Sequence, residues 1–395
     1  MGERFARRLA SEVREWVSEG LVTAEQAARI LARYPEGAGW LARPAALFAL
    51  VGGALIAAGV ALVVAHNWEN IHRWVKLVGL VVLMGLAHGA GLAARGRGYP
   101  RVGAGVTVIG GALLLVGIAL VGQIYNLSGR PSDAVLMWWV LLLPAGYALP
   151  TVALAGLAYA GVVVWFLMAL WDPATWLGAG LHARFEQATV ALGAFGVVLF
   201  GVGALHAGDA WRRLRTQLES LGLVGLFAAL LMLGALWREG RLRPEPGAAP
   251  AAMILLLLAA AAAVASAAGL PATRPGLRRG FVALLLGLLA YLGAVKTAVA
   301  TGHPAIVATL ALVGWGVLLG AALGVILFGA RWGRRAWVNV GLLAIGVEAI
   351  VRYVDLFGTM LEAGALFLST GVFVLALGWA LERVRRRMTP SAAER

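Results

Sequence analysis

Cysteine is absent from the 395 residues, and charged residues are scarce. Without cysteine the chain can form no disulfide, no thiolate metal site and no cysteine nucleophile. Charged residues make up 13% of the chain, about half of the roughly 25% found in an ordinary soluble domain. Acidic residues are fewer than basic ones: the chain has 19 Asp and Glu and 33 Lys and Arg, which gives a formal net charge of +14.

The apolar residues indicate the solvent of this protein. They make up 61% of the chain, and the mean hydropathy is +0.85. One water-soluble globule could not bury so much apolar surface, because surface area grows too fast relative to volume. Disordered chains are poor in hydrophobic residues and are excluded as well. The composition therefore predicts an all-α polytopic membrane protein whose first partner is the lipid bilayer.

The excess positive charge does not indicate a nucleic-acid partner. Residues 1–43 carry seven Arg and six Glu, which leaves the remaining +13 to the rest of the chain. That charge is distributed in short clusters between apolar runs, whereas a nucleic-acid interface would form a continuous basic face. We therefore expect no nucleic acid among the partners.

The first 43 residues form a predicted cytosolic region of their own. Phe5, Leu9, Val13 and Val17 are spaced four apart and place apolar side chains on one helical stripe. Gly20 ends this helix, and Thr23-Ala-Glu-Gln26 has the spacing of a capping box that begins a second one. Two readings stay open for this hairpin: an amphipathic anchor at the membrane surface, or a module in residues 1–36 that docks a cytosolic protein.

Twelve apolar runs are long enough to cross a bilayer, which takes about 20 residues. We expect a transmembrane domain over 44–382, followed by a basic cytosolic tail over 383–395. The predicted spans are 44–65, 74–94, 102–122, 134–149, 151–171, 188–206, 221–237, 251–270, 281–300, 305–328, 337–354 and 361–380. The division at Pro144 to Pro150 is open, because 134–171 reads either as two short spans or as one long broken span.

Arginine outside the spans separates the two sides of the membrane. With both termini inside, 24 arginines fall in inside segments and six in outside loops. Cytoplasmic loops concentrate Arg and Lys, so this asymmetry favours twelve spans with the N- and C-termini in the cytoplasm. Treating 134–171 as one span would reverse every later loop and remove the asymmetry.

One apolar span carries three charged residues. The run Glu348-Ala-Ile-Val-Arg352-Tyr353-Val-Asp355 places Glu348 and Arg352 four apart on one helix face, and Asp355 three residues further on. Charges inside a bilayer are rare and are functional candidates by default. The group could couple transport to a proton or an ion, with Tyr353 beside it, or it could be a structural ion pair near the outer interface.

Polar residues also gather in two predicted outer loops. The first loop holds His66, Asn67, Glu69 and His72, of which the two histidines and the glutamate offer too few ligands for a convincing metal site. The second holds Gln123, Tyr125 and Asn126 ahead of Trp138-Trp139, a composition that suits a lipid head-group or sugar site as well as an ordinary capped loop with interfacial aromatics. No catalytic residue, metal or cofactor is predicted.

Several motifs together resemble a bacterial family. The segments EGLVTAEQAARILARYP, HNW…IHRWVKL and GQIYNLSG…WW are similar to the family called domain of unknown function 2157. The closing stretch RYVDLFGTML…ALFLSTGVFVLALGWALERVRRR is similar to the C-terminal end of its longer members. The resemblance implies a multi-pass protein of the bacterial inner membrane, implies no established activity, and adds interest to Asn67, Gln123, Tyr125, Arg352, Tyr353 and Asp355.

Two classes of function follow from these observations. The first is a transporter or lipid translocase with a polar intramembrane site at Glu348, Arg352 and Asp355. The second is a non-catalytic scaffold or envelope-stress component that docks a partner through residues 1–36. A membrane enzyme at the outer face, using His66, Glu69, His72 and Tyr125, ranks last because it has no clear nucleophile or metal set.

Overall fold

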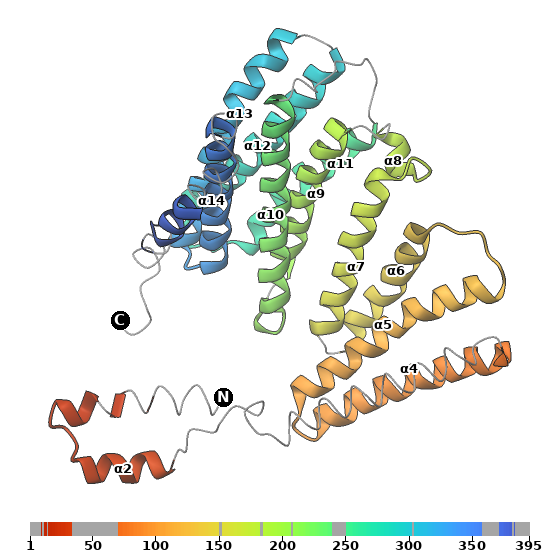
Figure 1. The fold of residues 1–395 in the computed structure, drawn as a ribbon, viewed down its shortest axis with the longest axis vertical. Coiled ribbons are helices and arrows are strands. Elements are labelled where there is room, and N and C mark those ends of the chain that lie inside the picture. The colour runs from red at the N-terminus through yellow and green to blue at the C-terminus, as the bar shows by residue number, and fades with distance from the viewer. Residues whose placement is uncertain are drawn as a thin grey trace. The chain divides into compact units, whose positions relative to one another are not determined.

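The computed structural model describes residues 9, 12–13, 15–33, 70–149, 152–181, 185–206, 208–238, 250–301, 304–357, 371–380 and 383. These residues contain helices and no strand, in the order α2 (Ala24–Arg33), α4 (Arg73–Gly96), α5 (Pro100–Ile124), α6 (Pro131–Ala148), α7 (Val152–Trp171), α8 (Trp176–Gly180), α9 (Phe185–Leu205), η3 (Asp209–Trp211), α10 (Arg212–Arg238), α11 (Pro250–Ala265), η4 (Ser266–Gly269), α12 (Pro275–Thr301), α13 (Pro304–Arg331) and α14 (Arg335–Phe357) (Figure 1). The chain divides into two compact units, Met1–Gly79 and Leu80–Arg395.

The N-terminal unit contains the capping box that the sequence predicts. The backbone amide of Thr23 donates to Gln26 Oε1 at 2.9 Å, and the amide of Gln26 donates to Thr23 Oγ1 at 3.2 Å. These reciprocal bonds satisfy two amides that the first turn of α2 would otherwise leave open. An exposed ion pair, Glu25 with Arg29, follows on the solvent side of the helix.

Within the described residues, nine helices are long and apolar enough to cross a membrane. They are α4, α5, α7, α9, α10 with its leading η3 turn, α11 with η4, α12, α13 and α14. Helix α6 forms where a span is predicted but is not among the nine, because its first turn contains Pro131, Ser132 and Asp133 and lowers its apolar content. The predicted span 44–65 lies outside the described residues, and only Gly371–Ala380 of the last one is described.

The segment around Pro150 consists of two helices that run antiparallel. Gly146 of α6 lies against Ala155 of α7, where an added Cβ would come 2.8 Å from the Ala155 Cα. Further along, Gly161 of α7 packs on Trp138 and Trp139 of α6. The order of these contacts along the two helices is that of a helical hairpin, and one long broken helix could not make them. The Trp138 indole also donates to the Gly111 carbonyl of α5 at 2.8 Å, so it is buried in the bundle.

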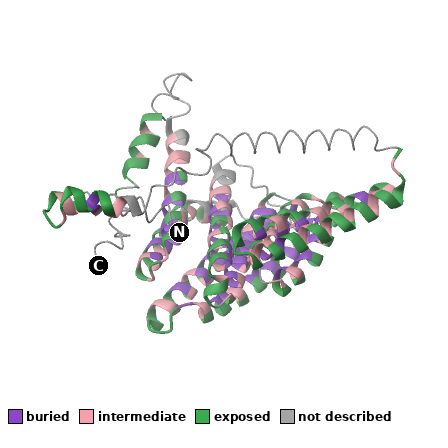
Figure 2. Ribbon diagram, turned by 90° about the horizontal axis from the view of Figure 1, so that it is seen from below, coloured by how far each residue is buried: buried purple, intermediate pink, exposed green. Residues whose placement is uncertain are grey.

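Helix α9 is the centre of the bundle in the unit Leu80–Arg395. Of its most apolar window 78% is buried, against 6% for α4. Figure 2 shows the buried residues lying between helices whose other faces are exposed. Its residues are small where neighbours cross: Gly196 meets Gly222 of α10, and Gly201 meets Ala262 of α11. In lipid, where apolar burial does not drive helices together, such close backbone contact supplies much of the packing energy.

Contacts between connections show that the helices alternate in direction. At one end, Arg215 Nη2 donates to the Gly269 carbonyl, and Arg274 Nη1 donates to the Arg331 carbonyl at 2.9 Å. We call this the arginine-rich end, because the segments joined there carry Arg95, Arg97, Arg101, Arg212, Arg213, Arg215, Arg274, Arg278, Arg279, Arg331, Arg334 and Arg335. At the opposite end, Arg130 Nη1 donates to the Ala174 carbonyl, and Gly180 packs on Ala251. The connections named here thus lie at two different ends of the bundle.

Enlarging Gly222 should separate α9 from α10. A Cβ at Gly196 would come 2.5 Å from the Gly222 carbonyl oxygen, and a Cβ at Gly222 would come 2.7 Å from the Phe200 amide nitrogen. Backbone atoms cannot rotate away, so Gly222→Ala should destabilise the bundle by about 1–3 kcal/mol. The measurement is the melting temperature of the purified protein in detergent.

Gly225→Ala is the matched control one turn away on α10. Its Cβ would meet the Gly196 Cα at 3.5 Å, an ordinary van der Waals contact, and its melting temperature should stay near that of the wild type. Equal melting temperatures for the Gly222 and Gly225 variants would contradict the close-contact account.

Candidate functional site

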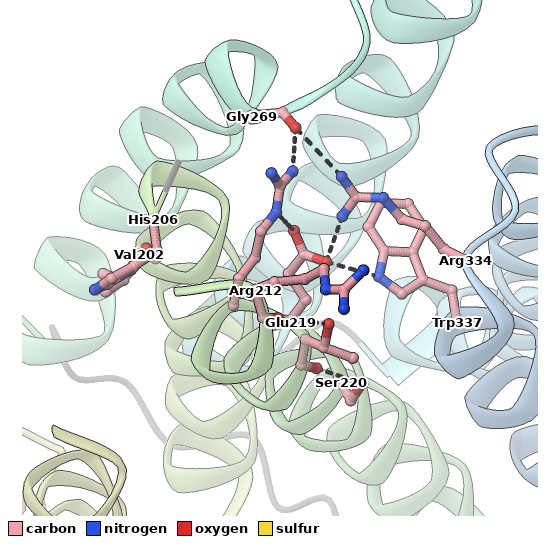
Figure 3. A network of polar contacts seen from close by, with 10 residues as sticks. Val202, His206, Arg212, Glu219, Ser220, Gly269, Arg334 and Trp337 are labelled. Carbon is pink, nitrogen blue, oxygen red and sulfur yellow. Dashed lines mark hydrogen bonds and ion pairs between the residues drawn. The ribbon is translucent and has the colours of Figure 1, made fainter. Parts of the chain in front are cut away.

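One buried carboxylate, Glu219 of α10, organises the arginine-rich end. Its side chain is 2% exposed and accepts three hydrogen bonds (Figure 3). Arg215, one turn earlier on the same helix, donates from Nε to Oε1 at 2.8 Å. Arg334 donates from Nη1 to Oε2, and the Trp337 indole donates to the same oxygen at 3.1 Å. A charge this deeply buried is tolerated because it is paired and hydrogen-bonded.

The same two guanidiniums reach a third element through the carbonyl of Gly269 at the end of η4. Arg215 Nη2 and Arg334 Nη2 both donate to that oxygen, the second at 3.3 Å. A Cβ at Gly269 would come 3.0 Å from the Ala204 Cα, so the close approach of η4 to α9 requires glycine. Arg334 also lies over the Trp337 ring, 4.7 Å from its centroid. Glu219 thereby joins α10, η4 and the start of α14.

A cavity of about 810 Å³ lies at the same end, between α5, α7 and α10. Three arginines line it: Arg95 at the end of α4, and Arg212 and Arg213 at the start of α10. Asp209 is the carboxylate among its lining residues. The other lining residues are mostly apolar or small and include Val152, Ala153, Gly156, Ala160, Leu214, Leu218 and Leu221.

A chain of aromatic hydroxyls fixes one wall of this cavity. Tyr159 of α7 lines the cavity, and its hydroxyl lies 2.8 Å from the Tyr147 hydroxyl of α6. The Tyr147 hydroxyl lies 2.6 Å from His206 Nε2, whose other ring nitrogen bonds the Val202 carbonyl at 2.8 Å. Trp211 packs against both Tyr147 and His206. These contacts link α6, α7, α9 and η3.

The predicted pair Glu348 and Arg352 forms within α14. Arg352 Nε donates to Glu348 Oε1 at 2.7 Å, and the two side chains are 13% and 6% exposed. The guanidinium lies over the Trp315 ring of α13, 3.6 Å from its centroid. On the α10 side it faces Gly234, where an added Cβ would come 3.0 Å from Nη2. Arg352 therefore occupies the place where α10, α13 and α14 meet.

Tyr353 and Asp355 are the other two residues predicted beside this pair. The Tyr353 ring stacks on Phe373, with centroids 4.6 Å apart. Asp355 lies on the last turns of α14, and its side chain is outside the described residues. A role for it beside Arg352 remains a prediction.

The outer-loop candidates lie elsewhere. Gln123 ends α5, and Tyr125 and Asn126 follow it, all three with exposed side chains; Asn126 adopts a left-handed backbone with φ of 48°. Asn67 and Glu69, with His66, are outside the described residues. Because α5 packs on α6 and α7 while α14 packs on α10 and α13, the loop 123–126 and the Glu348 pair belong to different parts of the bundle. Among the described residues, no three His, Asp or Glu side chains gather closely enough to hold a metal.

Loop 125–133, in which we include the first turn of α6, is fixed by an exposed ion pair at the opposite end. Arg130 donates from Nε and Nη2 to the two carboxylate oxygens of Asp133, each at 3.0 Å. Ser132 Oγ donates to Asp172 Oδ2 at 3.2 Å, which ties the loop to the end of α7. The hydrogen bond from Arg130 lowers the pKa of Asp133 below its ordinary value of 3.8.

Glu219 and the cavity arginines are the features that sequence reasoning missed. The predicted span begins at 221, whereas α10 begins at Arg212 and continues through it, so Glu219 lies inside the helix. The signal was present in the spacing of Arg215 and Glu219, which is four, as in Glu348 and Arg352. The arginines 95, 212 and 213 entered the sequence analysis as topological charge and not as the lining of a cavity.

These features define a multi-pass helical membrane protein with polar groups both inside the bundle and at its arginine-rich end. Residues 14–155 match the model of the family described as predicted membrane protein, DUF2157, which confirms the resemblance in α2 and α4 to α6. The similarity of the closing stretch lies beyond the matched residues and stays a prediction. No curated protein and no solved structure matches the chain.

Removing the charge of Glu219 should destabilise the bundle strongly. Glu219→Gln keeps the shape of the side chain but leaves Arg215 and Arg334 without their counter-ion. Removing one partner of a buried ion pair lowers the free energy of unfolding by about 3–5 kcal/mol. We therefore expect a clearly lower melting temperature or a lower folded yield. Glu25→Gln is the control, because its pair with Arg29 has the same spacing but 78% exposed side chains and should change neither. Equal tolerance of both variants would contradict the structural role of Glu219.

Acid should loosen loop 125–133. Because the pKa of Asp133 is lower in the folded state, the pair stabilises the loop above the ordinary pKa of 3.8 and loses this effect as pH falls through the lowered value. The chain has no native cysteine, so Leu127→Cys can carry a single spin label, whose mobility should rise as the pH falls below 3.8. Adding Asp133→Asn should make the label mobile already at pH 7. A label at Tyr99, in the turn after α4, should show no such titration, and a pH-independent label at 127 would refute the account.

Proposed function

We propose that this chain is a transporter or lipid translocase of the bacterial cytoplasmic membrane, with Glu348 and Arg352 as its intramembrane coupling pair. The observation that carries the proposal is a buried ion pair on α14 where it packs against α10 and α13, three helices that could each span the membrane. Ionisable side chains at such depth are rare and mark ion or substrate pathways more often than packing. Arginine at the proposed inner end sets the orientation, with both termini in the cytoplasm.

The geometry suits a pair that can open and close. Arg352 donates to Glu348 and lies over the Trp315 ring. Gly234 has no Cβ and so leaves room for the Arg352 guanidinium. Protonation of Glu348 would remove the counter-charge of the guanidinium and favour its pairing with another anion, such as a substrate head group. A packed apolar pair of the same volume would provide equal or greater stability, so stability alone is a weak reason for an ion pair here.

The scaffold alternative rests on a different part of the chain. It assigns function to residues 1–36, of which the capping box and the helix α2 are described. The buried pair of α14 contributes nothing to that alternative, and it is therefore the feature that separates the two.

Replacing both charges together tests the coupling role with the ion pair removed as a unit. The double variant Glu348→Gln/Arg352→Gln keeps two hydrogen-bonding side chains of similar shape, so its melting temperature should stay close to that of the wild type. In proteoliposomes, dithionite quenching of nitrobenzoxadiazole-labelled phosphatidylglycerol reports transbilayer movement. The wild type should accelerate this movement, and the double variant should lose the acceleration.

The exposed pair supplies the control for this experiment. Glu25→Gln/Arg29→Gln removes the same two charges at the same spacing and should leave lipid movement unchanged. A folded Glu348/Arg352 double variant with full activity would refute the coupling role. A wild type that moves no labelled lipid would refute the translocase proposal.

A further inference from the structure

The cavity at the arginine-rich end combines a cationic rim with an apolar wall. Arg95, Arg212 and Arg213 provide three positive charges against the single carboxylate of Asp209, a net charge of +2 among the lining residues. Leu214, Leu218 and Leu221 follow on α10 toward the interior of the bundle. A ligand that fits both features has an anionic head and an apolar body.

The arginines are positioned by the fold and not only by local charge. The aliphatic stem of Arg95 lies against Gly103 of α5, close enough that a Cβ at this glycine would overlap the Arg95 Cγ. The same glycine lets α4 approach, because its Cβ would also come 2.5 Å from the Gly91 carbonyl oxygen. Arg212 and Arg213 are set by the turn η3, whose Trp211 packs on Tyr147 and His206. A partly preformed cationic site loses less entropy when an anion binds.

Neighbouring arginines at the same end do not line the cavity and contact other groups. Arg215 and Arg334 share the Glu219 carboxylate, and both donate to the Gly269 carbonyl. Arg274 donates to the Arg331 carbonyl. Arg95, Arg212 and Arg213 line a volume of about 810 Å³, within the range of about 300–1,000 Å³ typical of small-ligand sites.

We propose that this cavity binds the phosphate head group of an anionic membrane lipid, with the acyl chains along the apolar wall of α7 and α10. Three span-forming helices, α5, α7 and α10, line it at the end that the arginine distribution places in the cytoplasm. Basic pockets between membrane helices on that side suit phospholipid head groups. The site goes beyond the proposed function and does not depend on it, because it lies near the start of α10, whereas Arg352 contacts the other end of that helix at Gly234.

Titration of the purified full chain with soluble short-chain lipid tests the proposal. Dioctanoyl phosphatidylglycerol should bind saturably in isothermal titration calorimetry and raise the melting temperature. Dioctanoyl phosphatidylcholine carries a choline cation beside the same phosphate. It should bind at least about tenfold more weakly, because the lining arginines repel that cation. Equal binding of the two lipids would overturn the assignment of an anionic head group.

Glycerol 3-phosphate distinguishes a lipid from a soluble phosphate compound. It carries the phosphate without acyl chains and should bind at least about tenfold more weakly than the short-chain lipid, because it leaves the apolar wall unfilled. Affinity equal to that of the lipid would show a site for soluble phosphates and overturn the membrane-lipid assignment.

Two matched variants test the location. Arg212→Gln/Arg213→Gln should weaken phosphatidylglycerol about tenfold or more, whereas Arg278→Gln/Arg279→Gln removes the same charge from α12 at the same end and should leave affinity unchanged. Equal weakening by both would show general electrostatic attraction and overturn the site.

A cavity-filling variant keeps the proposal testable if the arginine variant fails to fold. A Cβ at Gly156 meets nothing nearer than Gln217 Oε1 at 3.8 Å, so Gly156→Leu should extend into the cavity and block the lipid while Gly156→Ala leaves it able to bind. Unchanged affinity in a folded Gly156→Leu protein would overturn the proposal. The Glu348→Gln/Arg352→Gln double variant should bind lipid normally, so failure of the coupling pair and failure of this site are distinguishable.

Discussion

The arrangement of the bundle depends on the pairing of one carboxylate with two guanidiniums. Glu219 is buried to 2% exposure, and its charge would be prohibitive there without Arg215 and Arg334. Both arginines also bind the Gly269 carbonyl, which the end of η4 would otherwise leave open. Three connections of the chain therefore meet at one point, and the directions of α10, α12 and α14 follow from it.

This pairing also divides the arginines into two groups. Those that are bound by Glu219 or by backbone carbonyls fix the helix ends, and Arg95, Arg212 and Arg213 line the cavity. The first group explains how helices with so few acids can end in clusters of positive charge without repelling one another. The second group provides a field directed at a single volume, and a cationic rim above an apolar wall is selective for molecules with both properties.

Much of the fold could be predicted from composition and spacing, because a membrane imposes lengths that are easy to count. Ten of the predicted spans coincide with described helices, and the Thr23–Gln26 capping box forms as its spacing predicts. Pairing at i and i+4 also located Glu348 with Arg352 correctly. These features are local, so the chain order carries the necessary information.

What could not be predicted depends on contacts between distant residues. Arg334 and Trp337 reach Glu219 across more than one hundred residues, and no local pattern indicates which arginine will do so. Helix α10 begins at Arg212, earlier in the chain than the predicted span that starts at 221. Hydropathy marks where a helix enters lipid and not where its hydrogen bonding begins. The cavity is formed by residues of α4, α5, α7 and α10, most of which are far apart in the sequence, so no local pattern shows that they meet.

Two pairs with the same spacing illustrate how environment decides a role. Arg215 with Glu219 has a second arginine, an indole and a carbonyl as partners, and every described contact ties one helix to another. Arg352 with Glu348 lies inside one helix, and its neighbours on α10 and α13 are a glycine and an aromatic face. A glycine and a ring constrain a guanidinium far less than a carboxylate and a carbonyl do. The first pair therefore ties several elements of the bundle together, whereas the second lies between α10, α13 and α14, where a coupling role is our proposal.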